Sequence, residues 1–165
     1  MIQSNYMMRA KLPRIGNGSR SIAQSLLKLL ESGFAVLDGC VLLQSLLSLN
    51  KNAKLQDFPD KTGFECYVNS IHIDDYVEGG DFEQSIPFLF ELFATWNKTF
   101  QNKILRAIIS SDEFGTVLRF HVVREGDSWL SENLEEYEEA ILIADSTDVT
   151  SLIDATRAPL IRGTR

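Results

Sequence analysis

Three consecutive segments decide the fold of this chain: Ser85-Ile-Pro-Phe-Leu-Phe-Glu-Leu-Phe-Ala-Thr-Trp-Asn-Lys-Thr-Phe100, Ile104-Leu-Arg-Ala-Ile-Ile109 and Val117-Leu-Arg-Phe-His-Val-Val123. Large apolar residues recur every four positions in the first segment, which predicts a helix with one apolar face: Phe88, Leu92, Trp96 and Phe100, with Leu89 and Phe93 beside them. Ser85 is suited to cap this helix, and Pro87 falls in its first turn, where proline is tolerated.

The other two segments are apolar runs with the composition of strands. The sequence between them, Ser110-Ser-Asp-Glu-Phe-Gly115, has the chemistry of a hairpin turn. A further strand is expected over Ala140-Ile-Leu-Ile-Ala144, whose continuous apolar run is typical of a central strand. The segment from Phe64 to Asp74 alternates over its centre, which predicts another strand, with a bulge near Ser70 where the alternation breaks. The helix is therefore expected to pack against a sheet.

The first fifty residues are rich in leucine and predict two helices. The first covers residues 21–30, where Ser19 or Ser21 can cap the start and Gly33 can end the helix. The second is expected from Asp38 to residue 49. The short run Phe34-Ala-Val-Leu37 between them fits either a strand or a link.

The two ends of the chain carry weaker patterns. Residues 1–20 are interpreted as a partly ordered leader, and residues 156–165 as a frayed tail after a short helix over residues 149–155. No repeat, low-complexity block or linker divides the 165 residues, so we expect a single domain, 1–165. The expected fold class is α+β: an antiparallel or mixed sheet packed against helices, with a leucine-rich helical N-terminal part.

Charge is distributed unevenly along the chain. Residues 1–56 hold seven Lys and Arg against two Asp and Glu, whereas residues 57–154 hold six against twenty-one; the whole chain carries −7. Because such a surface repels phosphate, we expect residues 57–154 to make no direct contact with nucleic acid. The excess of carboxylates favours a basic partner and speeds association with it.

The sequence lacks the motifs that mark several classes of function. The chain has no glycine-rich phosphate loop, dinucleotide fingerprint or serine nucleophile elbow, so we expect neither an enzyme nor a cofactor. Cys40 and Cys66 are too few and too far apart for a disulfide framework or a zinc site, and buried free thiols fit a reducing cytoplasm. Charged residues and glycines interrupt the apolar stretch from Ile22 to Leu49, so no membrane span is expected.

Acidic residues interleaved with aromatic ones are the candidates for partner binding. Aromatic anchors among carboxylates suit a partner that presents Lys, Arg and apolar side chains. The aromatic and leucine residues of the acidic run can equally pin a turn to the core, which is the preferred interpretation of Leu134. The predicted partner-binding residues are Asp74, Asp75, Glu78, Asp112, Glu113, Phe114, Trp129, Glu132, Glu135, Glu136, Tyr137, Glu138 and Glu139.

The second half of the chain resembles a known class of protein. The order Phe120-His-Val-Val-Arg-Glu-Gly-Asp-Ser-Trp129, Leu130-Ser-Glu-Asn-Leu-Glu-Glu-Tyr137 and Glu138-Glu-Ala-Ile-Leu-Ile143 is similar to the strand, tryptophan, acidic turn and strand of small bacterial immunity proteins. These proteins accompany toxins of contact-dependent growth inhibition and related polymorphic toxins. The similarity spans about residues 64–146 and follows a pattern, so it transfers no site residue. It implies a cytoplasmic, non-catalytic protein that binds one cognate toxin domain.

The expected function is therefore that of an immunity protein. It would occlude the active site of a toxin, a basic nuclease, by pairing its carboxylates with Lys and Arg of the toxin. One alternative is a small hydrolase or transferase that uses His72 or His121, which requires their two strands to be neighbours for the histidines to act as a pair. Another is an adaptor module that binds a different basic protein.

Overall fold

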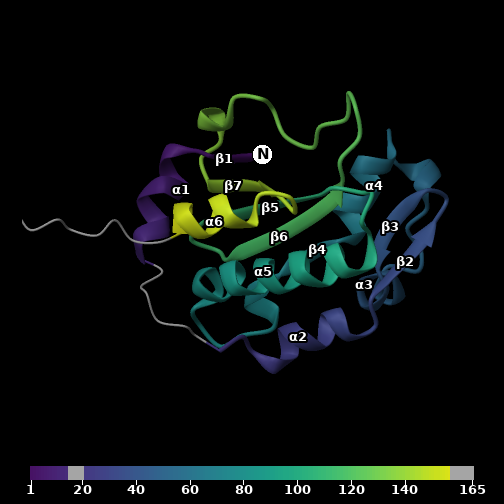
Figure 1. The fold of residues 1–165 in the computed structure, drawn as a ribbon, viewed down its shortest axis with the longest axis horizontal. Helices are drawn as coiled ribbons and strands as arrows, with labels where there is room; N and C mark the ends of the chain where they lie inside the picture. The colour runs from purple at the N-terminus through teal and green to yellow at the C-terminus, as the bar shows by residue number, and fades with distance from the viewer. Residues whose placement is uncertain (15–20, 157–165) are drawn as a thin grey trace, which may run out of the picture.

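The computed structural model describes residues 1–14 and 21–156, and a five-stranded antiparallel sheet lies at its centre (Figure 1). The strand order is β1-β7-β5-β6-β4, so β5 and β6 pair with each other inside the sheet. The bounds of the strands are β1 Ile2–Ser4, β4 Ser70–His72, β5 Leu105–Ser111, β6 Thr116–Val122 and β7 Ala140–Asp145. A separate hairpin consists of β2 Phe34–Leu37 and β3 Cys40–Leu43.

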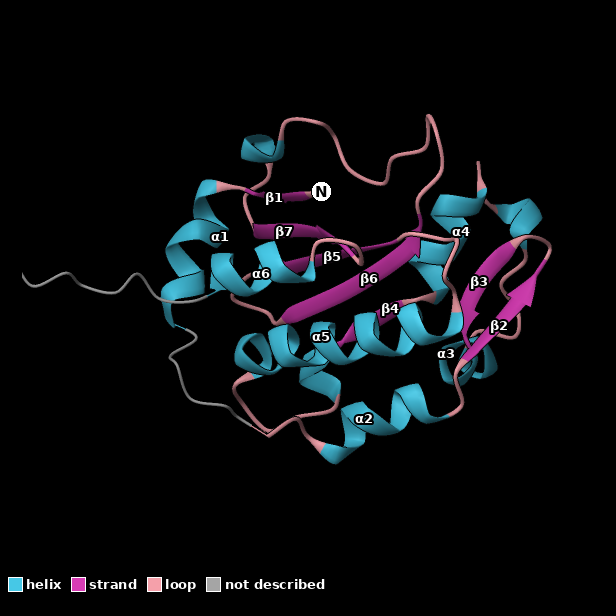
Figure 2. Cartoon of the chain, viewed as in Figure 1, coloured by secondary structure: helices cyan, strands magenta, loops and turns pink. Residues whose placement is uncertain are grey.

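The α-helices of the described residues are α1 Tyr6–Lys11, α2 Gln24–Glu31, α3 Gln44–Leu49, α4 Lys61–Val68, α5 Asp81–Thr99 and α6 Val149–Thr156. Short 3-10 turns lie at η1 Leu12–Arg14, η2 Leu55–Asp57, η3 Ile73–Asp75 and η4 Leu134–Glu136. Figure 2 shows α5 and α6 in front of the sheet, with α2 below α5. The arrangement confirms the predicted α+β class, with a sheet that is antiparallel throughout.

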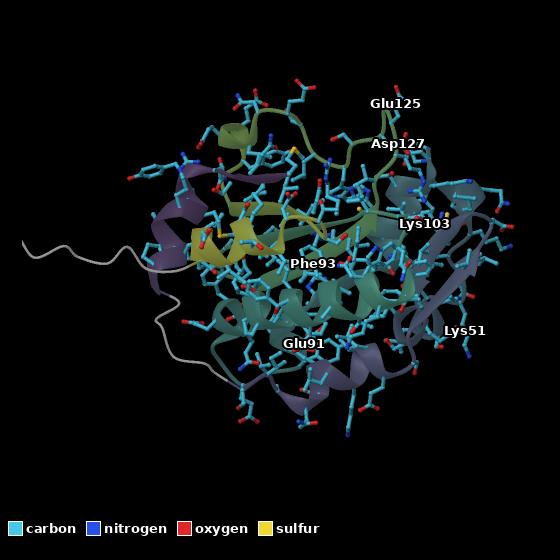
Figure 3. All side chains as sticks on the ribbon, viewed as in Figure 1. Lys51, Glu91, Phe93, Lys103, Glu125 and Asp127 are labelled. Carbon is cyan, nitrogen blue, oxygen red and sulfur yellow. The ribbon has the colours of Figure 1, made fainter. Side chains whose placement is uncertain are left out.

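The longest helix, α5, supplies the apolar layer that covers the sheet. Phe88, Leu92, Phe93 and Trp96 have no exposed surface, and Phe100 is half-buried beyond the helix end. Figure 3 shows Phe93 between α5 and the sheet, and Glu125 at the tip of the loop after β6. The predicted periodicity of this segment is thus confirmed.

The start of α5 differs from the prediction. The cap is Gly80 (φ +65°), five residues before the predicted cap Ser85, so the helix begins at Asp81 and Pro87 lies inside it. The Ser85 hydroxyl donates to the carbonyl of Phe82 (2.6 Å) and caps nothing. Asp81 and Glu83 occupy the first turn, where negative charge is favoured by the helix dipole.

The N-terminal segment is also more ordered than predicted. Residues 1–14 form β1, α1 and η1, and residues 15–20 lie outside the described chain. The buried Asn5 side chain accepts hydrogen bonds from the N–H groups of Met8 and Ile141 (3.0 Å each) and donates to the carbonyls of Glu139 (2.7 Å) and Leu134 (3.3 Å). One asparagine therefore caps α1 and ties it to the chain around β7, a contact that local sequence does not show. Of the predicted tail, Thr156 ends α6 and residues 157–165 lie outside the description.

Three further features differ from the predicted secondary structure. Asp38 (φ +51°) does not cap a helix: with Gly39 (φ +78°) it forms the two-residue turn of the β2–β3 hairpin, and only α3 remains helical. The predicted cap of α2 is absent as well, because Ala23 occupies that position without a side-chain hydrogen bond. Residues 61–68 form α4, with Asp60 as its N-cap through the N–H of Gly63 (2.6 Å). Of the strand predicted from Phe64 to Asp74, only Ser70–His72 is extended, as β4.

Buried polar groups on α4 join the hairpin to the main sheet. The Glu65 carboxylate accepts hydrogen bonds from the backbone N–H groups of Val41 on β3 (2.7 Å) and Val122 on β6 (2.9 Å), and it pairs with Arg124 (2.7 and 2.8 Å). One turn later, Asn69 accepts from the N–H of Leu43 (2.8 Å) and donates to the carbonyl of Val41 (2.9 Å). These two side chains satisfy the outer edge of β3 in place of a neighbouring strand.

Candidate functional site

The tip of the β5–β6 hairpin presents an exposed aromatic ring. The Asp112 carboxylate accepts hydrogen bonds from the N–H groups of Phe114 (2.8 Å) and Gly115 (3.2 Å), which closes the turn as aspartate does in this position. The Phe114 side chain is 84% exposed. A large ring held in water by a defined turn is available for contact with a partner.

The carboxylate of Asp74 lies against this turn. A Cβ atom placed on Gly115 (φ +149°) would come within 2.6 Å of Oδ1 of Asp74, so only glycine allows the approach. Asp74 belongs to η3, directly after β4, and β4 pairs with β6. The sheet therefore brings Asp74 and Asp112 together although 38 positions separate them in the sequence.

Three shallow hollows of about 300, 280 and 600 Å³ surround Phe114. We call this region the acidic tip, and it contains Phe114 and the carboxylates that line the hollows: Asp74, Asp81, Glu83, Asp112, Glu113, Glu138 and Glu139. They come from η3, the start of α5, the hairpin turn and the chain before β7. Lys11 also lines two of the hollows; its ammonium donates to the hydroxyl of Ser111 (2.6 Å) and lies 4.8 Å from the ring centre of Phe82.

The acidic tip unites six of the thirteen predicted partner-binding residues: Asp74, Asp112, Glu113, Phe114, Glu138 and Glu139. The prediction missed Asp81 and Glu83, because the helix was expected to start at Ser85. The available signal was the pair Asp81 and Glu83 directly after Gly79-Gly80, since acids favour the first turn of a helix. It also missed Lys11, whose segment was interpreted as a leader.

The other seven predicted residues do not line these hollows. Asp75, Glu78 and Glu132 are exposed elsewhere on the surface. Glu135 accepts hydrogen bonds from the N–H of Tyr6 (2.9 Å) and from Arg9 (2.8 Å), and these contacts lower the pKa of its carboxyl. Glu135 therefore links η4 to α1 by hydrogen bonds.

Internal contacts also occupy the neighbours of Glu135. Glu136 accepts a hydrogen bond from the side-chain amide of Asn133 (3.1 Å). Leu134 packs against the second face of the sheet, as predicted, and Tyr137 lies half-buried beside it. The Tyr137 hydroxyl accepts a hydrogen bond from the N–H of Ser131. Within the acidic run, Glu135 and Glu136 thus make structural contacts and Glu138 and Glu139 belong to the acidic tip.

Trp129, the remaining predicted residue, borders a separate groove of about 400 Å³. We call it the aromatic groove; it is lined by Asn50, Cys66, Tyr67, Ser70, His72, Arg119 and Trp129. His72 and Arg119 also line one hollow of the acidic tip, so the two regions adjoin. Burial raises the pKa of the Cys66 thiol to about 12, so this thiol stays protonated well above neutral pH.

The two histidines lie on neighbouring strands but do not form a pair. His72 is exposed and stands opposite Val117, whereas His121 is buried four residues further along β6, roughly 13 Å away at a strand's rise per residue. Burial lowers the pKa of His121, and its Nε2 has no hydrogen-bond partner in the described residues. In that part of the chain no group of three or more His, Cys, Asp or Glu side chains is arranged to hold a metal ion.

Fold and site together define a small α+β protein that exposes an aromatic ring within a cluster of carboxylates. The chain belongs to the PM0498 family: the family described as "Uncharacterized protein PM0498 family" matches residues 3–154. The protein of that name from Pasteurella multocida (strain Pm70) is 33% identical over 140 residues, which cover 78% of this chain and 87% of that protein. No solved structure matches the chain. Among residues 1–14 and 21–156, no helix has the length and hydropathy to span a bilayer.

Proposed function

We propose that this protein is an immunity protein that binds a basic toxin domain, a nuclease, and occludes its active site in the cytoplasm. The observation that carries the proposal is the acidic tip, where an 84% exposed Phe114 is surrounded by carboxylates from four separate segments. The ring supplies an apolar anchor. The carboxylates supply partners for Lys and Arg that would otherwise bind phosphate.

The mechanism is steric and electrostatic. A nuclease site attracts the nucleic-acid backbone with positive charge, and the acidic tip presents negative charge to the same site. The excess of carboxylates over residues 57–154 accelerates the encounter, and contact at the tip then denies the site to phosphate. No step of this mechanism needs a catalytic residue in the inhibitor, which agrees with the resemblance to immunity proteins.

The proposal predicts that a gene beside this one encodes the toxin, and the test measures binding to the C-terminal domain of that neighbouring protein by surface plasmon resonance. In the variant Glu113→Lys/Glu138→Lys, two exposed carboxylates of the acidic tip are reversed; neither makes a hydrogen bond within the described residues. The matched control Glu31→Lys/Asp57→Lys reverses two exposed carboxylates outside the tip. We expect the on-rate to fall at least about tenfold in the first variant and to change much less in the second.

A cell-based measurement separates this proposal from histidine chemistry. Cells that express the toxin should survive equally with the wild-type protein, His72→Ala or His121→Ala, and should lose protection with Glu113→Lys/Glu138→Lys. Loss of protection in a histidine variant that still folds and binds the toxin would instead indicate a chemical role for that histidine. Equal on-rates for the two charge reversals would reject the acidic tip as the binding surface.

A further inference from the structure

We propose that the aromatic groove binds a small ligand with one negative charge and a planar apolar body, an aromatic carboxylate. The groove measures about 400 Å³, which lies within the range of small-molecule sites. This inference does not depend on the proposed toxin partner, because it concerns the surface of β4 and β6 beside Trp129.

The guanidinium of Arg119 is the group that would hold the carboxylate. Four arginine side chains are described, and three are paired: Arg9 with Glu135 (2.8 Å), Arg106 with Asp145 (2.7 Å) and Arg124 with Glu65 (2.7 Å). For the guanidinium of Arg119, by contrast, no carboxylate within 4.0 Å and no hydrogen bond is found among the described residues, although the side chain is only half-exposed. A half-buried guanidinium with free donors is suited to bidentate binding of a carboxylate.

His72 provides a second donor beside Arg119. Ser70 stands opposite Arg119, and His72 stands opposite Val117, so His72 and Arg119 are diagonal neighbours on one face of the sheet. Diagonal neighbours in an antiparallel pair lie roughly 7–8 Å apart at their α carbons, within reach of two long side chains. One carboxylate can therefore contact both side chains.

Two exposed aromatic rings form the other wall of the groove. Trp129 is 41% exposed and Tyr67 is 54% exposed, and the Tyr67 ring packs beside that of Phe58, with 5.1 Å between ring centres. Such rings offer flat apolar faces to a planar ligand, as in other small-molecule sites. The Arg119 guanidinium and the two rings together suit a ligand that carries a negative charge on a planar apolar group.

The neighbouring carboxylates limit the charge of that ligand. Asp74 and Glu139 line the hollow that shares His72 and Arg119 with the groove. A ligand with several negative charges, such as a nucleoside diphosphate, would meet repulsion there within a Debye length of about 8 Å. A monoanion can be neutralised by Arg119 alone.

The test titrates the full chain with benzoate and with benzamide, which has nearly the same shape but no charge. The chain has two tryptophans and two histidines, and Trp96 and His121 are buried, so they serve as internal references. We expect benzoate to quench the fluorescence of Trp129 and to shift the imidazole NMR signals of His72, both in a saturable manner. Benzamide should bind at least about tenfold more weakly.

Variants assign the contacts. Arg119→Gln should weaken benzoate binding at least about tenfold and leave benzamide binding unchanged, because only the charge contact is lost. Trp129→Ala should weaken both probes, whereas Arg9→Gln, a matched change on α1, should affect neither. The proposal is overturned if benzoate gives no saturable change up to about 10 mM. It is also overturned if benzamide binds as tightly as benzoate, a comparison that needs no variant.

Discussion

At the scale of single residues, Phe93 shows how much stability one side chain of α5 contributes. Its ring has no exposed surface and lies between the helix and the sheet. We expect Phe93→Ala to lower the free energy of unfolding by about 3–5 kcal/mol, because transfer to water and a residual cavity both cost free energy. Phe114→Ala, which removes the same atoms from an exposed position, should stay within about 0.5 kcal/mol in the same urea titration.

The burial of His121 predicts a dependence of stability on pH. Its pKa in the folded protein lies below the ordinary 6.5, because desolvation disfavours the imidazolium and the positive charges of Arg106 and Arg124 add to this, while the Val122 carbonyl and Glu65 act in the opposite direction. At pH values below 6.5 the imidazole is therefore more often protonated in the unfolded chain than in the folded protein. The free energy of unfolding consequently falls as the pH is lowered from 6.5 toward the pKa of His121 in the folded protein.

Unfolding by urea at about pH 7.5 and about pH 5.5 measures this dependence. Replacement by a neutral residue in His121→Gln should reduce the loss of stability between the two pH values by up to about 1.4 kcal/mol, the value of one pKa unit. His72→Gln is the control, since His72 is exposed. An unchanged pH dependence in His121→Gln would show that the buried imidazole does not resist protonation.

At the scale of elements, α4 acts as the joint between the β2–β3 hairpin and the main sheet. The joint depends on Glu65, which is fully buried and neutralised by Arg124. We expect Arg124→Met to lower the free energy of unfolding by about 3–5 kcal/mol, because it leaves a buried carboxylate without its cation. The matched change Arg9→Met breaks an exposed pair with Glu135 and should cost at most about 1 kcal/mol. Similar losses in both variants would contradict the importance of burial at this joint.

At the scale of the whole molecule, the uneven charge should govern association with a basic partner. The net charge is −7, and the acidic tip concentrates carboxylates at one end of the sheet. The on-rate for the proposed toxin domain should therefore fall steeply as salt rises, since the Debye length shortens from about 30 Å at 0.01 M to about 8 Å at 0.15 M. The off-rate should change little over the same range. A flat on-rate in stopped-flow measurements would indicate binding driven by Phe114 and shape alone.

Patterns that repeat within one element were visible in the sequence. The four-residue period from Phe88 to Trp96, the turn Asp112 to Gly115 and the apolar run of β7 each arise from contacts of neighbouring residues with one common surface. They were sufficient for the α+β class, for the hairpin and for the acidic character of its tip. Such a repeat is visible in the sequence of the element itself, so it can be recognised without knowledge of the surface against which the element packs.

Tertiary structure alone decided the features that join distant parts of the chain. Short runs such as residues 40–43 and 61–68 carry no period long enough to separate strand from helix, and their conformation follows from bonds to Glu65, Asn69 and Asp60. The N-terminal segment is ordered because Asn5 bonds to Ile141, 136 positions away. The acidic tip likewise exists because strand pairing brings Asp74 to Gly115. Contacts of this kind leave no local mark in the sequence, since each depends on the position of a residue far away along the chain.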